Sequence, residues 1–343
     1  RNLIFDCERA GGSLVFAGDG SFTAYTDHVD GQGEYSPARV NGAPRMYIYG
    51  VLDQAYADAK VINKKQGIVS FPAGTGTVTM KLGTSYISAE QAKKNLEMEI
   101  GGDGFDETFQ KAQKTWDDQL RIIQVEGASF DQLTTLYSSM YRMFAYPILY
   151  SENVGTEKAE KWVYANPYGG SLGSPDVQDG KMYTINGFWD TYRSAWPAYS
   201  LLTPSMAGEM LDGLVEHYKV SGWVSRWVAP GAINCMLGTH ADAIFGDALS
   251  KGIDFDYENA FAASLKNSAV VSGNLDKGGR IETASSVFRG YTSTSVHEGF
   301  SWGMEDTVND YNIYKMAEAL GYTDEAAYYK NRALNYTNYF NKE

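Results

Sequence analysis

Residues 186–197, NGFWDTYRSAWP, place two Trp, a Tyr, an Asp and an Arg within twelve positions. Aromatic faces stack on the apolar C–H surface of a pyranose, while a carboxylate and a guanidinium hydrogen-bond its hydroxyl groups. Asp190 and Arg193 are three positions apart, so they would share one face if the segment opened a helix. Together with Trp189, they predict a sugar-binding pocket. The structural alternative is a buried Arg–Asp pair packed beneath the Trp.

The composition is that of a folded, acidic protein. The chain has 343 residues, 43% of them hydrophobic and 21% charged, which is enough for two domains and a buried core. Its 29 basic and 42 acidic side chains give a net charge of −13, and such a surface repels phosphate backbones and anionic headgroups. We therefore expect no nucleic acid and no membrane as partners. Acidic clusters could hold a hard cation such as calcium.

Low cysteine use fits a bacterial protein, either cytoplasmic or exported. Cys7 and Cys235 fall in what we expect to be different domains, and they give neither a disulfide framework nor metal-ligand spacing. No apolar run approaches the roughly 20 residues of a membrane span. Because the chain starts at Arg1 rather than Met, we expect the natural N-terminus to have been removed or left out.

Residues 1–100 predict an antiparallel β-sandwich domain. Short runs at 13–16, 21–25 and 45–51 are separated by glycine-rich turns. The clearest strand signal is at 77–82, where Val78, Met80 and Leu82 alternate with Thr and Lys. This period of two predicts that these three apolar side chains form a buried face.

Helical periodicity dominates the rest of the chain. The charged segments 89–99 and 105–123 predict connecting helices, and residues 101–128 are expected to form a linker. A helical domain is expected over 129–343, with an apolar stripe from Leu133 to Phe144. Thr203-Pro204 predicts a helix start, with Thr as N-cap and Met206 in the buried face. Further helices are expected near 239–250, 256–271, 307–320 and 323–341, with Gly321 as a stop, Thr323 as a cap and long functional loops at 164–186, 221–237 and 272–303.

Four segments between about 130 and 320 resemble glycoside hydrolase family 92, the calcium-dependent exo-α-mannosidases. They are NGFWDTYRSAWP (186–197), CMLGTHADAIFGDALSKGI (235–253), RGYTSTSV (289–296) and MEDTVNDYNIYKMAEALG (304–321). The upstream segments 86–100 and 115–127 look like the family's link between sandwich and helices. The resemblance implies a β-sandwich followed by an (α/α)6 barrel-type domain that is incomplete in this chain.

The resemblance also implies an activity. Members of the family release terminal α-mannosyl residues with inversion, and calcium beneath the sugar helps to distort its ring. Inversion needs a general acid and, roughly 6.5–9.5 Å away, a carboxylate that activates water. We therefore expect a hydrolase that takes mannose-containing glycans as its partners, as in N-glycan degradation by a bacterium. The expected location is secreted, cell-surface or periplasmic.

Glu305 is the residue that the resemblance marks as the general acid. The family motif resembles LEYAYDDW, and the aligned stretch here runs from Met304 to Tyr311. Asp306 and Thr307 replace the family's usual Tyr and Ala, which changes the surroundings of the acid. The structural alternative is a solvated Glu in the first turn of a helix, stabilised by the helix dipole.

Substrate contacts are implied for Trp189, Asp190, Arg193 and His240. The first three belong to a segment that lines the family's subsite for the terminal mannose, and His240 belongs to the second matching segment. The alternative for His240 is a structural histidine of the core. His297-Glu298 is a weaker acid/base candidate, because the match places the acid seven residues further on.

The family's general base lies in a segment resembling GNDDxGQMSAW, downstream of the acid, and no such segment occurs before Glu343. Asp190, Asp306 and Asp310 are the nearby substitutes, and none of them is favoured. We therefore expect a fragment, with the base, most calcium ligands and the C-terminal part of the same polypeptide beyond Glu343. Two other functions stay open: a non-catalytic carbohydrate-binding protein, and another (α/α)6 glycosidase such as a glucosidase.

Overall fold

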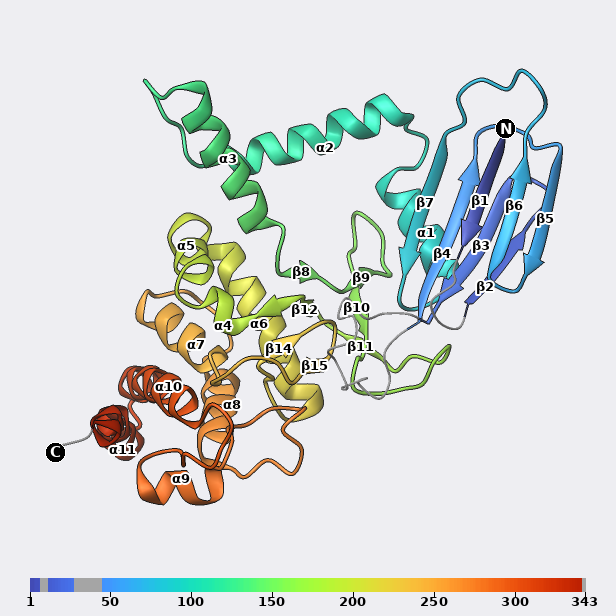
Figure 1. Ribbon diagram of the computed structural model, residues 1–343. Helices are drawn as coiled ribbons and strands as arrows, with labels where there is room; N and C mark the ends of the chain where they lie inside the picture. Colours follow the sequence, from blue (N-terminus) through green and yellow to red (C-terminus); the bar gives the residue numbers. More distant parts are fainter. Residues whose placement is uncertain (7–11, 28–44, 341–343) are drawn as a thin grey trace. The chain divides into compact units, whose positions relative to one another are not determined.

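The computed structural model describes residues 1–6, 12–27 and 45–340 (Figure 1). They form two compact units, the first within residues 1–141 and 151–180 and the second within 142–150 and 181–340. Cys7 lies outside the described residues, and Cys235 is a free thiol. No helix of the described part is both long and apolar enough to cross a bilayer.

Two antiparallel sheets pack face to face in the first unit, which confirms the predicted sandwich. Phe5, Phe16 and Phe22 meet edge to face between the sheets, with ring centroids 4.7 to 6.2 Å apart. One sheet has the order β2-β3-β4-β7, formed by Gly12–Phe16, Ser21–Thr26, Met46–Leu52 and Met80–Ser85. The other has the order β1-β6-β5, formed by Asn2–Asp6, Gln66–Ser70 and Asp58–Asn63.

The prediction for residues 77–82 is wrong in both its bounds and its buried face. β7 begins at Met80, and Met80 and Leu82 are 38% and 44% exposed, whereas Gly83 and Ser85 are buried. Helix α1 (Ala89–Glu99) covers the face that contains Gly83, where an added Cβ would lie 2.1 Å from the Ala92 carbonyl oxygen. The helix approaches where the strand has no side chain, and the apolar alternation does not reveal this.

The connecting helices occur as predicted, with small shifts at their ends. Ser88 caps α1 by accepting a hydrogen bond from the Gln91 backbone N–H. The second helix, α2, spans Phe105–Leu120 and ends three residues before the predicted 123. It is followed by α3 (Phe130–Phe144) and by an antiparallel sheet of β9 (Glu152–Asn153), β10 (Trp162–Ala165) and β11 (Val177–Asp179).

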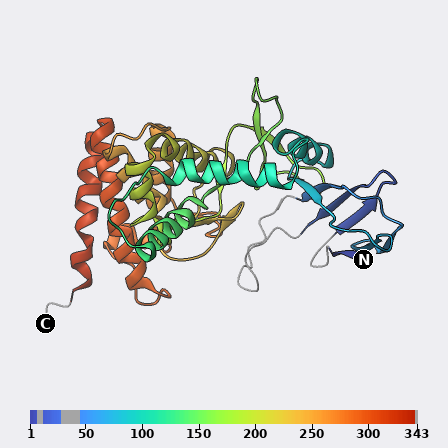
Figure 2. The same ribbon diagram turned by 90° about the horizontal axis from the view of Figure 1, so that it is seen from above.

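The second unit is mainly helical. Its core is formed by fully buried Leu211, Leu214, Phe245 and Ile313 from α6, α7 and α10. Its helices are α4 (Phe188–Thr191), α5 (Ala195–Leu202), α6 (Pro204–Ser221), α7 (Ala241–Ser250), α8 (Tyr257–Ala269), α9 (Thr283–Arg289), α10 (Gly299–Leu320) and α11 (Thr323–Arg332), then the 3₁₀ helix Ala333–Tyr339. Its short strands are β8 (Ile148–Leu149) with β12 (Tyr183–Thr184), and β13 (Asn186–Gly187) with β14 (Trp227–Val228) and β15 (Ala232–Ile233). α10 and α11 run side by side (Figure 2).

Several predicted helix ends are wrong in this unit. The expected loop 272–303 contains α9 and the start of α10, which begins eight residues before the predicted 307. Thr203 precedes α6 as predicted, but its hydroxyl donates to the Tyr199 carbonyl oxygen rather than capping the helix, and Met206 is exposed. Gly321 ends α10 in the left-handed conformation, as predicted, whereas Thr323 is the first residue of α11 and not its cap.

Candidate functional site

Glu305 lies in the second turn of α10 and meets the segment that follows α4. The Tyr192 hydroxyl donates to its Oε2 at 2.9 Å, and Arg193 Nη2 donates to its Oε1 at 2.7 Å. The Glu305 side chain is only 17% exposed, whereas that of Arg193 is 60% exposed. The site therefore presents one partly shielded carboxyl group beside an accessible guanidinium, from segments more than 100 residues apart in sequence.

His240 lies against the other side of Glu305 Oε2. It precedes α7, its Nε2 is 3.4 Å from that oxygen, and its Nδ1 is 3.0 Å from Asn309 Oδ1. The Tyr192 ring stacks on the imidazole with 4.1 Å between ring centroids and 5° between planes. His240 has no exposed side-chain surface, and this burial lowers its pKa to about 4, so the ring is neutral at neutral pH.

Tyr192 remains a donor over the physiological pH range. Burial raises the pKa of its phenol to about 12, and the Glu305 carboxylate adds to that rise. The sequence gives a signal for Tyr192, since it lies inside the segment 186–197 beside Arg193. Asn309 has a weaker signal: it follows Glu305 by four positions, so the two share a face of α10.

Asp190 and Arg193 do not form an ion pair with each other. Helix α4 ends at Thr191, Asp190 is exposed, and none of the described residues forms a hydrogen bond or ion pair with it. Arg193 pairs with Glu305 instead, which excludes the buried Arg–Asp pair as the reason for this motif. Trp189 is half-buried, and its indole N–H is shielded from solvent without an acceptor in the described part of the chain. Asp190 thus stays available to a ligand.

Gly238 maintains the close approach of His240 to Glu305. Its φ is +69°, and a Cβ there would lie 2.8 Å from His240 Nε2 and 3.1 Å from Glu305 Cβ. The neighbouring Met236 also has a positive φ, of 63°, which is strained for a side chain of this kind. The loop before α7 is therefore shaped around the contact between the histidine and the carboxyl group.

Because the sequence predicts Glu305 to be a general acid, Gly238→Ala is expected to lower turnover by the intact natural protein at least tenfold: the methyl group would push His240 and Glu305 apart. The control is Gly252→Ala, since Gly252 has a φ of +74° but open space around its Cβ position. Both variants should lose about 1–2 kcal/mol of stability from the left-handed backbone. Thermal melts and steady-state rates of the two variants separate the effects. Equal activity of both variants would contradict this role of Gly238.

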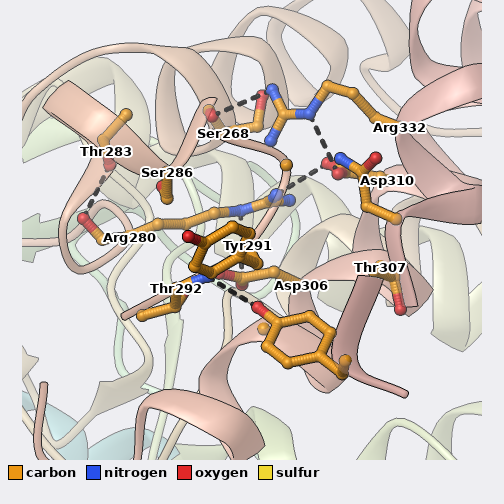
Figure 3. Close-up of a pocket in the computed structure, with 14 residues that line it drawn as sticks. Ser268, Arg280, Thr283, Ser286, Tyr291, Thr292, Asp306, Thr307, Asp310 and Arg332 are labelled. Carbon is orange, nitrogen blue, oxygen red and sulfur yellow. Dashed lines mark hydrogen bonds and ion pairs between the residues drawn. The ribbon is translucent and has the colours of Figure 1, made fainter. Parts of the chain in front are cut away.

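A second polar cluster surrounds Arg280 and includes Asp306, the residue that follows Glu305 (Figure 3). Arg280 Nη1 contacts Asp310 at 2.6 Å, Nη2 contacts Asp242 at 3.4 Å, and Nε contacts Asp306 at 3.4 Å. Arg332 Nε contacts the second oxygen of Asp310 at 3.0 Å. These ion pairs join α7, α10 and α11 to the loop before α9, and so fix the helix that carries Glu305.

Burial is the main cause of the shifted pKa values of Asp242 and Asp306 in this cluster. It raises the pKa of Asp242 to about 6 and that of Asp306 to about 7, and the Arg280 guanidinium opposes both rises. Burial alone would lower the pKa of Arg280, but the surrounding aspartates outweigh it and raise that pKa. The adjoining cavity of about 30 Å³ has room for one water, and neither Glu305 nor Trp189 lines it. We interpret the cluster as structural.

The described residues do not fit a calcium site. The carboxylates of Asp242, Asp306 and Asp310 surround the Arg280 guanidinium, which would repel a cation. No group of three or more His, Cys, Asp or Glu side chains within residues 1–6, 12–27 and 45–340 is arranged to hold a metal. The pair His297-Glu298 is far more exposed than Glu305, at 91% and 53%, and lies at the surface before α10.

A model of the glycosyl hydrolase family 92 catalytic domain matches residues 91–343, which is most of the chain. The chain belongs to glycoside hydrolase family 92. A solved family 92 inverting mannosidase from Bacteroides thetaiotaomicron is 26% identical, and the two structures superpose with a TM-score of 0.88 over 99% of this chain and 46% of that protein. A family 92 α-mannosidase from the same bacterium, solved in complex with mannoimidazole, is 20% identical with a TM-score of 0.75, over 95% of this chain and 43% of that protein.

A further relative by sequence comes from the fungus Arthroderma benhamiae. It is described as an uncharacterized secreted glycosidase and is 24% identical over 78% of this chain and 31% of its own length. The chain thus spans less than half the length of the relatives it matches. The structural matches confirm the predicted order of an antiparallel sandwich followed by a helical domain.

Proposed function

We propose that the protein containing this chain is an exo-α-mannosidase that hydrolyses terminal α-mannosyl residues with inversion. The main support is the contact of Glu305 with Tyr192 and Arg193. This contact brings together residues 186–197 and 304–321, two segments that resemble this family, at one partly shielded carboxyl group. Membership of the family and the 26% identity to an inverting mannosidase support the same reaction class. Mannose-containing glycans are the proposed substrates.

In this proposal Glu305 is the general acid. Its proton passes to the glycosidic oxygen as the bond from that oxygen to the anomeric carbon breaks. A water oxygen bonds to the opposite face of that carbon while a general base takes the proton that this water loses. The resulting Glu305 carboxylate keeps Tyr192 and Arg193 as hydrogen-bond donors, which stabilise its charge. Trp189 would stack on the sugar and Asp190 would accept from its hydroxyl groups. We assign the general base to none of the described residues.

Calcium dependence and location complete the proposal. The family resemblance implies a calcium requirement, which EDTA treatment followed by calcium addition tests directly. A secreted, cell-surface or periplasmic bacterial enzyme suits glycans as substrates, and the fungal relative is itself described as secreted. No step of the mechanism above depends on the metal.

The deciding experiment is NMR of the first product formed by the intact natural protein from an α-mannoside. Release of β-mannose before mutarotation is the expected result. Sugar binding without turnover would identify a carbohydrate-binding protein instead, and α-mannose would exclude inversion. Release of glucose from the matching α-glucoside, with inhibition by glucose rather than mannose, would identify another glycosidase.

A further inference from the structure

We propose that His240, oriented by Asn309, is a positioning residue that holds the acid proton of Glu305 on Oε2. The inference rests on the proposed function, because it concerns the protonated state that a general acid needs before it reacts. It rests on the different neighbours of the two buried ring nitrogens of His240: Asn309 Oδ1 lies at Nδ1, and Glu305 Oε2 lies at Nε2.

The first step is the tautomer of His240. The amide oxygen of Asn309 faces Nδ1 at 3.0 Å, and an amide oxygen only accepts hydrogen bonds. In this orientation of the Asn309 amide, whose Nδ2 is buried without a partner among the described residues, Nδ1 carries the proton of the neutral ring and Nε2 is left with a lone pair. Both side chains are fully buried, so water does not compete for either nitrogen.

The second step is the partner of Nε2. This nitrogen is buried without a hydrogen-bond donor among the described residues, and Glu305 Oε2 lies 3.4 Å away. If Glu305 were ionised, a lone pair of its Oε2 would face the lone pair of His240 Nε2, and the two acceptors would repel each other. A protonated Oε2 would instead donate to Nε2 and still accept from the Tyr192 hydroxyl, which satisfies all three groups.

The third step excludes proton transfer to the imidazole. The charged or titratable groups facing His240 are Tyr192 and Arg193 from the segment after α4, Glu305 from α10 and Arg280 from the loop before α9. Burial opposes an imidazolium most strongly, both guanidiniums oppose it further, and Glu305 alone among the charges favours it. The proton is therefore retained by Glu305 until the leaving oxygen takes it.

Two variants of the intact natural protein test this role. His240→Phe keeps an aromatic ring against Tyr192 but removes the acceptor for the Glu305 proton. Asn309→Leu frees Nδ1, so that the ring proton moves to Nε2 and donates to the Glu305 carboxylate. Both changes favour ionised Glu305. The alkaline limb of kcat/KM, which reports deprotonation of the acid in the free enzyme, should move to lower pH by about one unit in each variant.

A purely structural role of His240 would give a different result. It would lower the rates for an alkyl mannoside and for 2,4-dinitrophenyl α-mannoside equally, without moving the alkaline limb, and this result would overturn the proposal. The matched control is His217→Phe. His217 is equally buried, burial lowers its pKa to about 4, and its Nε2 lies 2.9 Å from the Tyr183 carbonyl oxygen. That variant should leave the limb in place.

The wild-type protein provides a test without substitutions. Long-range ¹H–¹⁵N spectra at neutral pH should show the Nδ1–H tautomer for His240, and an Nε2–H tautomer would overturn the proposal even if neither variant folds. Failure of the proposed function has a separate signature: the intact wild-type protein would not hydrolyse an alkyl mannoside, or Glu305→Gln would leave that hydrolysis unchanged.

Discussion

Glu305→Gln is expected to lower turnover of an alkyl α-mannoside by about 100- to 10,000-fold, the range that general acid catalysis contributes. The amide has a similar shape but cannot supply a proton to the glycosidic oxygen. A 2,4-dinitrophenyl leaving group departs without protonation, so hydrolysis of that mannoside should fall much less. Steady-state rates on the two substrates measure this difference directly.

The control for this variant is Glu298→Gln. Glu298 lies just before the same helix and is 53% exposed, and it pairs with His297, which is 91% exposed. Its replacement should leave both rates within about twofold of the wild type, as for surface changes generally. If Glu305→Gln lowers the two substrates to the same degree, its loss reflects geometry or substrate binding and not proton donation.

The elements of the fold were largely predictable from periodicity. α1 matches its predicted bounds, and α6 begins at Pro204 as the Thr-Pro pair indicates. The buried face of β7 was not predictable, because Gly83 permits the approach of α1 only once both elements are packed. The early start of α10 was hidden for a similar reason: Gly299 and Gly303 weaken the helical signal.

Candidate site residues could be predicted within single segments of the sequence, but their contacts with residues of other segments could not. The pairing of Arg193 with Glu305 needs the folded chain, since helical spacing alone predicts Asp190 as its partner. His240 was a candidate for sugar contact, and its complete burial leads us to propose an indirect role. The function of Arg280 had no local signal, because its three aspartates come from two helices and meet it only in the fold.

Arg280→Met is expected to destabilise the protein by about 3–5 kcal/mol at pH 8, the usual effect of removing one partner from a buried charge network. The variant leaves Asp242, Asp306 and Asp310 facing one another, with Arg332 as the remaining cation in contact with Asp310. Arg289→Met is the control, because Arg289 forms a partly exposed pair with Glu282 and its loss should cost less than about 1 kcal/mol.

The pH dependence of this loss follows from the carboxyl groups that remain. In the folded wild type the pKa of Asp306 is already raised to about 7 and that of Asp242 to about 6, and removing the guanidinium raises both further. A carboxyl group whose pKa is higher in the folded than in the unfolded state contributes stability below its unfolded pKa, and this contribution is lost as pH rises through the folded value. The variant should therefore be closer to wild type at pH 5 than at pH 8 in urea unfolding. A deficit that is larger at pH 5, or no larger than that of Arg289→Met at pH 8, would show that the aspartates do not depend on Arg280 for their charge.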